Sequence, residues 1–168
     1  QILADLMTYQ EEKGSIQGKK IAWIGDGCNV CQTYMQAAEI FDFELSIATP
    51  AGYEPSETFS QKYKKNINFF NNPMQACQEA DVVVTDVWTS MGQESEKKQR
   101  ESSFKGFQVD QLMMNQAKAD AIFMHCLPAY RGIEVSSEVI DGSQSVVWSE
   151  AENRLHAQKS LLLYLIED

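Results

Sequence analysis

The chain has 168 residues, of which 43% are hydrophobic and 23% charged, and its formal net charge is −10 at pH 7. A chain of this length forms one domain with a sizeable core. The acidity argues against nucleic acid or an anionic membrane as a partner, because both attract basic surfaces. No run of about 18 apolar residues is present, which argues against a membrane-spanning helix.

The start of the chain lacks both an initiator Met and the basic and apolar regions of a signal peptide. It begins at Gln1, inside a stretch with helical apolar spacing, which predicts a piece of a longer protein. The four cysteines are Cys28, Cys31, Cys77 and Cys126. An even count is compatible with disulfides, but a chain of this size does not need such staples. We therefore expect reduced thiols and a cytoplasmic location.

Short apolar runs alternate with amphipathic stretches along the chain. Helices are predicted at residues 2–13, 29–43, 56–65, 73–80, 109–117, 134–140 and from 150 onward, with Ser149 as the cap of the last one. Strands are predicted at residues 20–24, 44–48, 67–70, 81–86, 121–125 and 145–148. This pattern indicates an α/β fold, a Rossmann-like three-layer sandwich with a mostly parallel sheet of about five to six strands flanked by helices.

Right-handed crossovers place the carboxyl ends of parallel strands on one side of the sheet, where ligands of such folds bind. The segments after the first, fourth, fifth and sixth strands are therefore the candidate site. The charged stretch 90–105, which follows the fourth strand, is interpreted as a surface loop that is mobile without ligand and can act as a lid.

Gly25-Asp26-Gly27-Cys28-Asn29 follows the first strand and resembles part of a dinucleotide fingerprint. The spacing fails because Val30 stands where that motif needs glycine, and Asp26 would repel a pyrophosphate. A purely structural turn remains an alternative. Cys28 and Cys31 also form C-x-x-C, a redox or half-zinc spacing, but no second pair follows.

Each later segment offers one reactive or charged side chain. Asp86 ends the fourth strand and suits an ammonium group, although it could equally cap a turn. Cys126 follows the fifth strand, where a buried structural thiol is the alternative. Arg154 lies one turn into the last helix, where the helix dipole disfavours a cation. It therefore indicates a carboxylate or bound-anion partner, with a plain surface arginine as the alternative.

Read together, these segments resemble the ornithine carbamoyltransferase family over essentially the whole chain. The matching motifs are W-I-G-D-G-x-N at 23–29, A-T-P-x-G-Y-E-P at 48–55, D-x-W-x-S-M-G-Q-E at 86–94, H-C-L-P at 125–128 and E-A-E-N-R at 150–154. Residues 1–6 also resemble the end of the family's H-P-x-Q-x-L-A-D segment.

The resemblance implies carbamoyl transfer from carbamoyl phosphate to the δ-amine of L-ornithine, giving L-citrulline and phosphate. Family members have two α/β lobes and form trimers or multiples of trimers. The S-T-R-T-type phosphate site of the first lobe is absent from this sequence. Residues 1–168 are thus expected to be a single ornithine-binding domain without the carbamoyl-phosphate-binding lobe, inactive alone and binding ornithine weakly.

Carried over by motif, the resemblance gives each candidate a role. Ornithine binding would use Asn29 for the α-carboxylate, and Asp86, Ser90 and Met91 around the α-amino group. Carbamoyl phosphate binding would use Gln1, Cys126, Leu127 and Arg154, and the catalytic residues would be Cys126, Arg154 and Asp86. The Leu127–Pro128 bond is expected to be cis, as in the family. No metal or organic cofactor is implied.

One departure from the family pattern is Cys28, where a second Asn is frequent, and it puts the hydrogen bonds beside Asn29 in doubt. Alternative functions are carbamoyl transfer to acetylornithine, putrescine or aspartate, a nucleotide-binding oxidoreductase domain, and a non-catalytic interaction domain. The last helix is apolar on more than one side, which predicts contact with another lobe, or self-association of the isolated chain.

Overall fold

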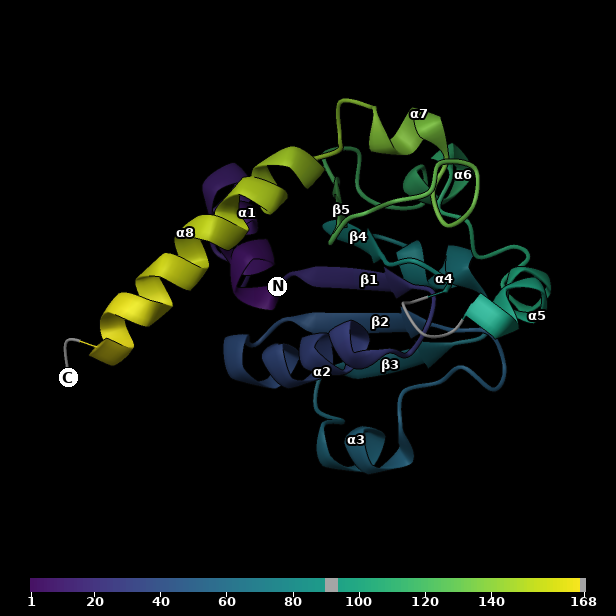
Figure 1. Ribbon diagram of the computed structural model, residues 1–168, viewed down its shortest axis with the longest axis horizontal. Coiled ribbons are helices and arrows are strands. Elements are labelled where there is room, and N and C mark those ends of the chain that lie inside the picture. Colours follow the sequence, from purple (N-terminus) through teal and green to yellow (C-terminus); the bar gives the residue numbers. More distant parts are fainter. Residues whose placement is uncertain (90–93, 167–168) are drawn as a thin grey trace.

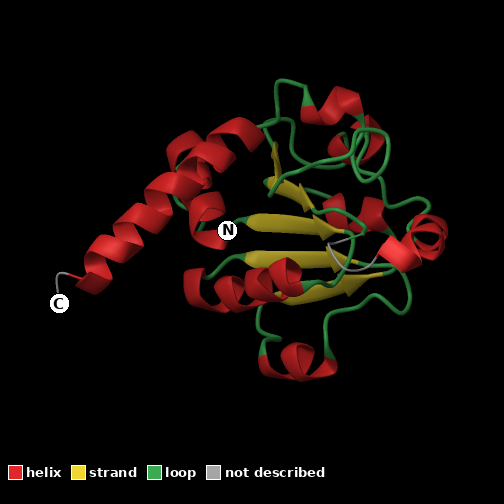
Figure 2. Ribbon diagram, viewed as in Figure 1, coloured by secondary structure: helices red, strands yellow, loops and turns green. Residues whose placement is uncertain are grey.

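A parallel sheet forms the centre of the molecule. The computed structural model describes residues 1–89 and 94–166. Within these residues the strands are β1 (Lys20–Ile24), β2 (Glu44–Ala48), β3 (Ile67–Phe70), β4 (Val82–Thr85) and β5 (Ile122–His125). They lie side by side in the order β3-β2-β1-β4-β5, and all neighbouring pairs are parallel (Figure 2). The order reverses between β1 and β4, so the crevice typical of such sheets opens there.

Helices cover both faces of this sheet. They are α1 (Ile2–Lys13), α2 (Asn29–Phe41), α3 (Glu57–Lys62), α4 (Pro73–Cys77), α5 (Lys97–Ser103) after the 3-10 turn Glu94–Glu96, α6 (Gln111–Met114), α7 (Ser137–Ile140) and α8 (Val147–Ile166). Successive side chains of β1 enter opposite cores, because strand side chains alternate in direction. Ile21 and Trp23 pack with α1 and α2, whereas Ala22 and Ile24 pack with α4, α6 and α7. The three-layer α/β architecture expected from the sequence is confirmed.

Helix α8 lies beside α1 in its first half and then runs beyond the body of the molecule (Figure 1). Asn153 on α8 joins the two helices, since its amide donates to the Thr8 hydroxyl at 3.0 Å and to Glu11 at 2.7 Å. The outer part of α8 carries exposed apolar side chains: Leu161, Leu162, Leu163, Tyr164, Leu165 and Ile166. Among the described helices, none combines the length and apolar character that crossing a bilayer requires.

The predicted strands 20–24, 44–48 and 67–70 have the bounds expected from the sequence. The sixth strand, 145–148, was a wrong prediction. Ser145 makes a single bridge to Phe123, and the chain turns into α8 at Val147 before a ladder can form. The last helix consequently starts before Ser149, and the helix expected at 134–140 is reduced to α7. Part of the stretch 90–105, interpreted as a loop, is the helix α5.

Candidate active site

The turn after β1 is held against the chain that follows β2. The Gly27 amide donates to the Tyr53 carbonyl at 2.8 Å. A Cβ atom at Gly27 would lie 2.2 Å from the backbone nitrogen of Pro55, so only glycine fits here. This close approach brings the two motifs at 23–29 and 48–55 into contact. It also fixes the start of α2 at the crevice between β1 and β4.

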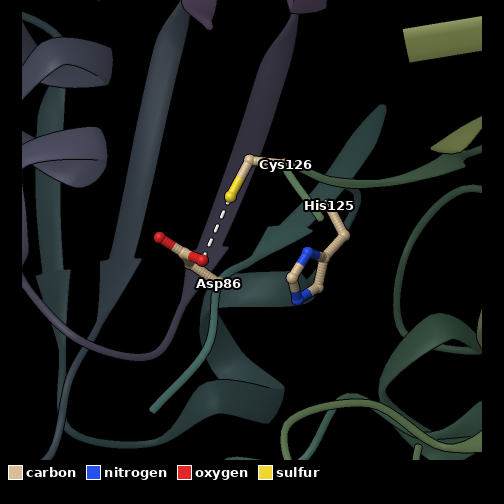
Figure 3. Close-up of side chains that lie close together, drawn as sticks. All are labelled: Asp86, His125 and Cys126. Carbon is tan, nitrogen blue, oxygen red and sulfur yellow. Dashed lines mark hydrogen bonds between the residues drawn. The ribbon is translucent and has the colours of Figure 1, made fainter. Parts of the chain in front are cut away.

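Asp86 lies directly after β4 and joins the two sides of the crevice. It is 8% exposed, and its carboxylate accepts a hydrogen bond from the Val87 amide at 2.7 Å. The thiol of Cys126, directly after β5, donates to Oδ1 of Asp86 at 3.0 Å, as the dashed line in Figure 3 shows. The thiol of Cys28, at the start of α2, approaches Oδ2 at 3.7 Å. One carboxylate therefore connects the ends of β1, β4 and β5.

Both thiols around Asp86 are protonated. Burial, followed by the negative charge of Asp86, raises the pKa of Cys126 well above its ordinary value. Burial is also the main cause that raises the pKa of Cys28 to about 11. A thiol in this state donates a hydrogen bond but does not act as a nucleophile, because the thiolate is the reactive form.

His125 shapes the turn that carries Cys126. The imidazole is fully buried, and its Nδ1 accepts a hydrogen bond from the Leu127 amide at 2.9 Å. Its Nε2 faces Oε1 of Glu134 at 3.3 Å. Leu127 has a φ of 52°, in the left-handed region that costs a branched side chain energy, so the surrounding contacts must hold it there. The Leu127–Pro128 peptide bond is cis, as expected.

Asp86, His125 and Cys126 are the described residues that come closest to a metal-binding arrangement, with ligand atoms within 4.8 Å of one another. Their chemistry does not fit that use. The ring nitrogens of His125 face Leu127 and Glu134, and the Cys126 thiol is protonated and bonded to Asp86. A thiol must be deprotonated to bind a metal. We therefore assign no metal to this group.

A cleft of about 680 Å³ opens beside Cys126, and residues after β5 and from α8 line it. The lining residues include Cys126, Leu127, Trp148, Ala151 and Arg154. The second arginine at the cleft, Arg131, is paired through two hydrogen bonds with Asp141. No carboxylate of a described side chain lies within ion-pair distance of Arg154, in a chain whose net charge is −10. Arg154 is thus the cation that the cleft offers to an anionic or polarised group.

Asn29 and Gln1, two of the remaining predicted site residues, are not among the residues that line this cleft. Asn29 is the exposed first residue of α2, next to Cys28 and hence on the α2 side of Asp86. The Gln1 side chain is engaged by Asp5 and Glu150. Ser90 and Met91, predicted to bind the α-amino group, lie outside the described residues.

Two buried groups near the site were not predicted from the sequence. The first is an ion pair between Arg100 on α5 and Asp26 in the turn after β1. The Arg100 guanidinium also donates to the Trp88 carbonyl at 3.0 Å and lies 4.9 Å from the Tyr53 ring. Apolar Phe104, one turn later, was the available signal that this charged stretch has a buried side.

The second group is a pair of buried carboxyls. Asp5 on α1 is 3% exposed and Glu150 on α8 is 1% exposed, and the Gln1 amide nitrogen donates to both, at 2.7 and 2.9 Å. Glu150 also accepts a hydrogen bond at 2.8 Å from the backbone N–H of His125. Both acids belong to matched motifs, which was the only sequence signal that they are special.

Comparison with known proteins identifies relatives of the chain. The family model "Aspartate/ornithine carbamoyltransferase, Asp/Orn binding domain" matches residues 17–165. The ornithine carbamoyltransferase of Ruthia magnifica is 61% identical over 166 residues, which cover 99% of this chain and 56% of that protein. The ornithine carbamoyltransferase of Nitrosococcus oceani is 58% identical over 166 residues, or 99% of this chain and 55% of that protein.

Solved structures show the same fold. The ornithine carbamoyltransferase of Burkholderia thailandensis matches with a TM-score of 0.88 and 47% identity, covering 98% of this chain and 53% of that one. The anabolic ornithine carbamoyltransferase of Campylobacter jejuni matches with a TM-score of 0.91 and 39% identity, covering 99% and 57%. The chain spans about half the length of the curated relatives it matches. It belongs to the aspartate/ornithine carbamoyltransferase family, in which it corresponds to the Asp/Orn-binding domain.

Proposed function

We propose that this chain is the ornithine-binding lobe of an ornithine carbamoyltransferase, which transfers a carbamoyl group from carbamoyl phosphate to the δ-amine of L-ornithine. The observation that carries the proposal is the meeting of three side chains. Asp86 is hydrogen bonded to Cys126, and Cys126 lines the same cleft as Arg154. These residues come from three of the sequence motifs, and the ornithine carbamoyltransferase of Ruthia magnifica is 61% identical to the chain over 166 residues.

Ornithine is held at both of its charged α-groups. The Asp86 carboxylate pairs with the α-ammonium group, together with Ser90 and Met91, because an ion pair in a partly dry crevice is stronger than in water. Asn29 at the first position of α2 binds the α-carboxylate, where helix N-terminal amides favour an anion. Ornithine replaces the Cys28 and Cys126 thiols as the main partner of Asp86. The δ-amine then extends toward Cys126 and the cleft.

The carbamoyl group reacts in the cleft by direct attack. The neutral δ-amine forms a bond to the carbamoyl carbon, the carbon–oxygen bond to phosphate breaks, and the phosphate leaves with that electron pair and takes up the proton that the nitrogen loses. Arg154 stabilises the negative charge that grows on the carbonyl oxygen, and the Leu127 backbone and Gln1 position the carbamoyl group. The protonated Cys126 acts as a hydrogen-bond donor, which favours direct transfer over a carbamoyl-thiol intermediate.

The other half of the parent enzyme supplies the phosphate site. The cleft offers Arg154 and an already paired Arg131, whereas a dianionic phosphate needs clustered donors. A second lobe therefore binds carbamoyl phosphate, and the parent assembles as a trimer or a multiple of trimers in the cytoplasm. All four cysteines are free thiols, which fits that reducing compartment.

Citrulline formation by the full-length parent enzyme tests this proposal. Cys126→Ala, Asp86→Ala and Arg154→Ala are each expected to lower kcat/KM by about 100-fold or more, while the melting temperature stays close to that of the unaltered enzyme. Glu152→Ala, an exposed position on α8, is the matched control with unchanged kinetics. A panel of ornithine, acetylornithine, putrescine and aspartate decides the acceptor. Turnover of another acceptor in preference to ornithine, or full activity of the 168-residue chain alone, would contradict the proposal.

A further inference from the structure

The two buried carboxyls, Asp5 and Glu150, join four separate segments of the chain. Asp5 Oδ1 and Glu150 Oε1 both accept from the amide nitrogen of Gln1. Asp5 Oδ2 accepts from the buried Tyr34 hydroxyl at 2.7 Å, and Glu150 Oε2 accepts from the His125 backbone N–H at 2.8 Å. The acids therefore connect α1, α2, the end of β5 and α8, and every carboxyl oxygen receives one donor.

Among the described side chains, none of the lysines or arginines forms an ion pair with Asp5 or Glu150. Two carboxylates that share a donor atom in a buried site repel one another strongly, and burial itself disfavours the charged forms. This repulsion is removed when one of the two acids stays protonated and donates a hydrogen bond to the other.

The pKa shifts of Glu150 and of the titratable groups near it are consistent with one shared proton. Burial, followed by the negative charge of Asp5, raises the pKa of Glu150 to about 9. Burial also raises the pKa of Asp5, opposed by its hydrogen bonds with Tyr34, Gln1 and Glu150. Tyr34 and Cys126, the other titratable groups near the pair, have pKa values raised well above the ordinary range, so they remain neutral at pH 7.

Glu150 contacts the turn that carries Cys126 and lies on the helix that carries Arg154. Its side chain holds the backbone N–H of His125, the residue immediately before Cys126. Its own backbone lies on α8, one helical turn before Arg154, and residues i and i+4 lie on the same side of a helix. A displacement of the Glu150 carboxyl therefore changes the distance between the Cys126 thiol and the Arg154 guanidinium.

We propose that Asp5 and Glu150 share one proton, and that Glu150, held by this acid pair, is a positioning residue that sets the Cys126 turn relative to Arg154. The inference rests on the proposed function for its kinetic consequence and on the contacts above for its chemistry. The structure thus contains a proton-bridged acid pair with a net charge of −1 behind the reacting groups. Glu150 does not itself contact the substrates in this role.

The kinetic test uses the full-length parent enzyme with Glu150→Ala, Glu150→Gln and the matched control Glu152→Ala. Glu150→Ala releases His125 and is expected to lower kcat by about 10- to 100-fold, with a much smaller change in the KM for ornithine. Glu150→Gln is expected to restore most of kcat, because its amide group donates to Asp5 and its oxygen accepts from His125. A kcat of Glu150→Ala equal to that of the unaltered enzyme, or a Glu150→Gln variant as impaired as Glu150→Ala, would overturn the positioning role.

The pH profile separates positioning from a merely structural role. The unaltered enzyme and Glu152→Ala are expected to lose kcat as the pH rises through about 9, where Glu150 ionises and the two acids repel one another. Glu150→Gln lacks the ionising group and should not show this loss. An identical alkaline loss of kcat in Glu150→Gln and in the unaltered enzyme would contradict the proposal.

Infrared spectroscopy tests the shared proton without reference to activity. The difference spectrum between the unaltered enzyme and Glu150→Gln at pH 7 is expected to contain the C=O stretching band of a protonated carboxyl group, which disappears above the pKa of Glu150. Absence of this band at pH 7 rules out the shared proton. Absence of citrulline formation by the unaltered enzyme would instead remove the proposed function, and the positioning role with it, while the infrared band still decides the protonation.

Discussion

The Sγ atom of Cys126 lies 3.0 Å from Oδ1 of Asp86, so a neutral thiol from the end of β5 donates to a carboxylate from the end of β4. The same carboxylate receives the Cys28 thiol at 3.7 Å from the start of α2. Burial, together with the negative charge of Asp86, keeps both thiols protonated, and the thiols in turn stabilise that charge in a crevice where the carboxylate is 8% exposed.

The reactivity of Cys126 therefore depends on Asp86. Asp86→Asn removes the nearby negative charge, and we expect the apparent pKa of Cys126 to fall and its alkylation by iodoacetamide at pH 8 to become faster. Mass spectrometry of the alkylated peptides, over a range of pH, measures this directly. Cys77, which is fully buried in the hydrophobic core, is the internal control and should stay unmodified in both proteins. Equal alkylation rates at Cys126 in both would show that Asp86 does not control the thiol.

Glycine is required at position 27 because the backbone of Pro55 lies too close for a side chain, and at position 52 because φ is positive there. Substitutions at the two positions separate these effects. Gly27→Ala would place a methyl group 2.2 Å from Pro55, and we expect a loss of about 3 kcal/mol in the free energy of unfolding. Gly52→Ala has open space around it but a φ of +87°, so about 1 kcal/mol is expected. Urea titrations measure both. A smaller loss for Gly27→Ala than for Gly52→Ala would refute the close-approach argument.

The Asp26–Arg100 ion pair fixes α5 against the turn after β1. Removing one partner leaves the other charge largely buried, so Asp26→Asn and Arg100→Met are each expected to cost about 3 kcal/mol. The double variant should cost clearly less than the sum, because it leaves no unpaired charge. Lys97→Met, on the exposed side of α5, is the control with little effect. Additive losses in the double variant would indicate that the two side chains do not interact.

The free energy of unfolding should decrease as the pH rises, because the pKa of Glu150 is raised in the folded state. The pKa of Glu150 is raised to about 9 in the folded state, whereas in the unfolded chain this group ionises near its ordinary pKa of 4.5. Between these values the unfolded state binds fewer protons, so the free energy of unfolding falls as the pH rises, by up to about 1.4 kcal/mol per unit. The contribution is complete below pH 4.5 and lost above pH 9. Melting temperatures from pH 5 to 9 should fall less in Glu150→Gln, and parallel curves for both proteins would argue against the raised pKa.

The outer part of α8 should make the isolated chain associate with itself. Leu162 is 59% exposed, Leu165 65% and Ile166 76%, which forms a continuous apolar surface at the end of the helix. Light scattering after size exclusion is expected to show a concentration-dependent mass above that of the monomer. Leu162→Glu with Leu165→Glu should restore a monomer, whereas exposed Lys159→Glu, on the same helix, should not. A monomer at every concentration would contradict the expectation.

Much of the fold could be predicted because strands in a covered parallel sheet are short apolar runs, and β1, β2 and β3 have the predicted bounds. The strand predicted at residues 145–148 was wrong for the same reason. The apolar pair Val146 and Val147 resembles part of a strand, although α8 begins at Val147. The site could be placed at the carboxyl ends of the strands from topology alone. The Cys126–Asp86 contact and the cleft position of Arg154 are consistent with that placement.

Buried polar pairs could not be predicted. Asp5 and Glu150 are 145 positions apart, and a carboxyl residue in a sequence is interpreted as exposed unless its partner is known. Arg100 lies in a hydrophilic stretch, and its burial depends on Asp26, which lies 74 positions earlier. The periodicity of apolar residues reports which faces of helices and strands are buried, but it contains no information about which charges meet.

The strand order has a consequence for how the site assembles. Asn29 belongs to the first sequential half of the sheet, β1 to β3, whereas Asp86, Cys126 and Arg154 belong to the second half, β4 onward. The crevice lies along the seam where these halves pair, so neither half alone can contain it. Two polypeptides divided between α4 and β4 would recover the Cys28–Asp86 contact only by docking, which makes formation of the crevice a reporter of late, long-range association during folding.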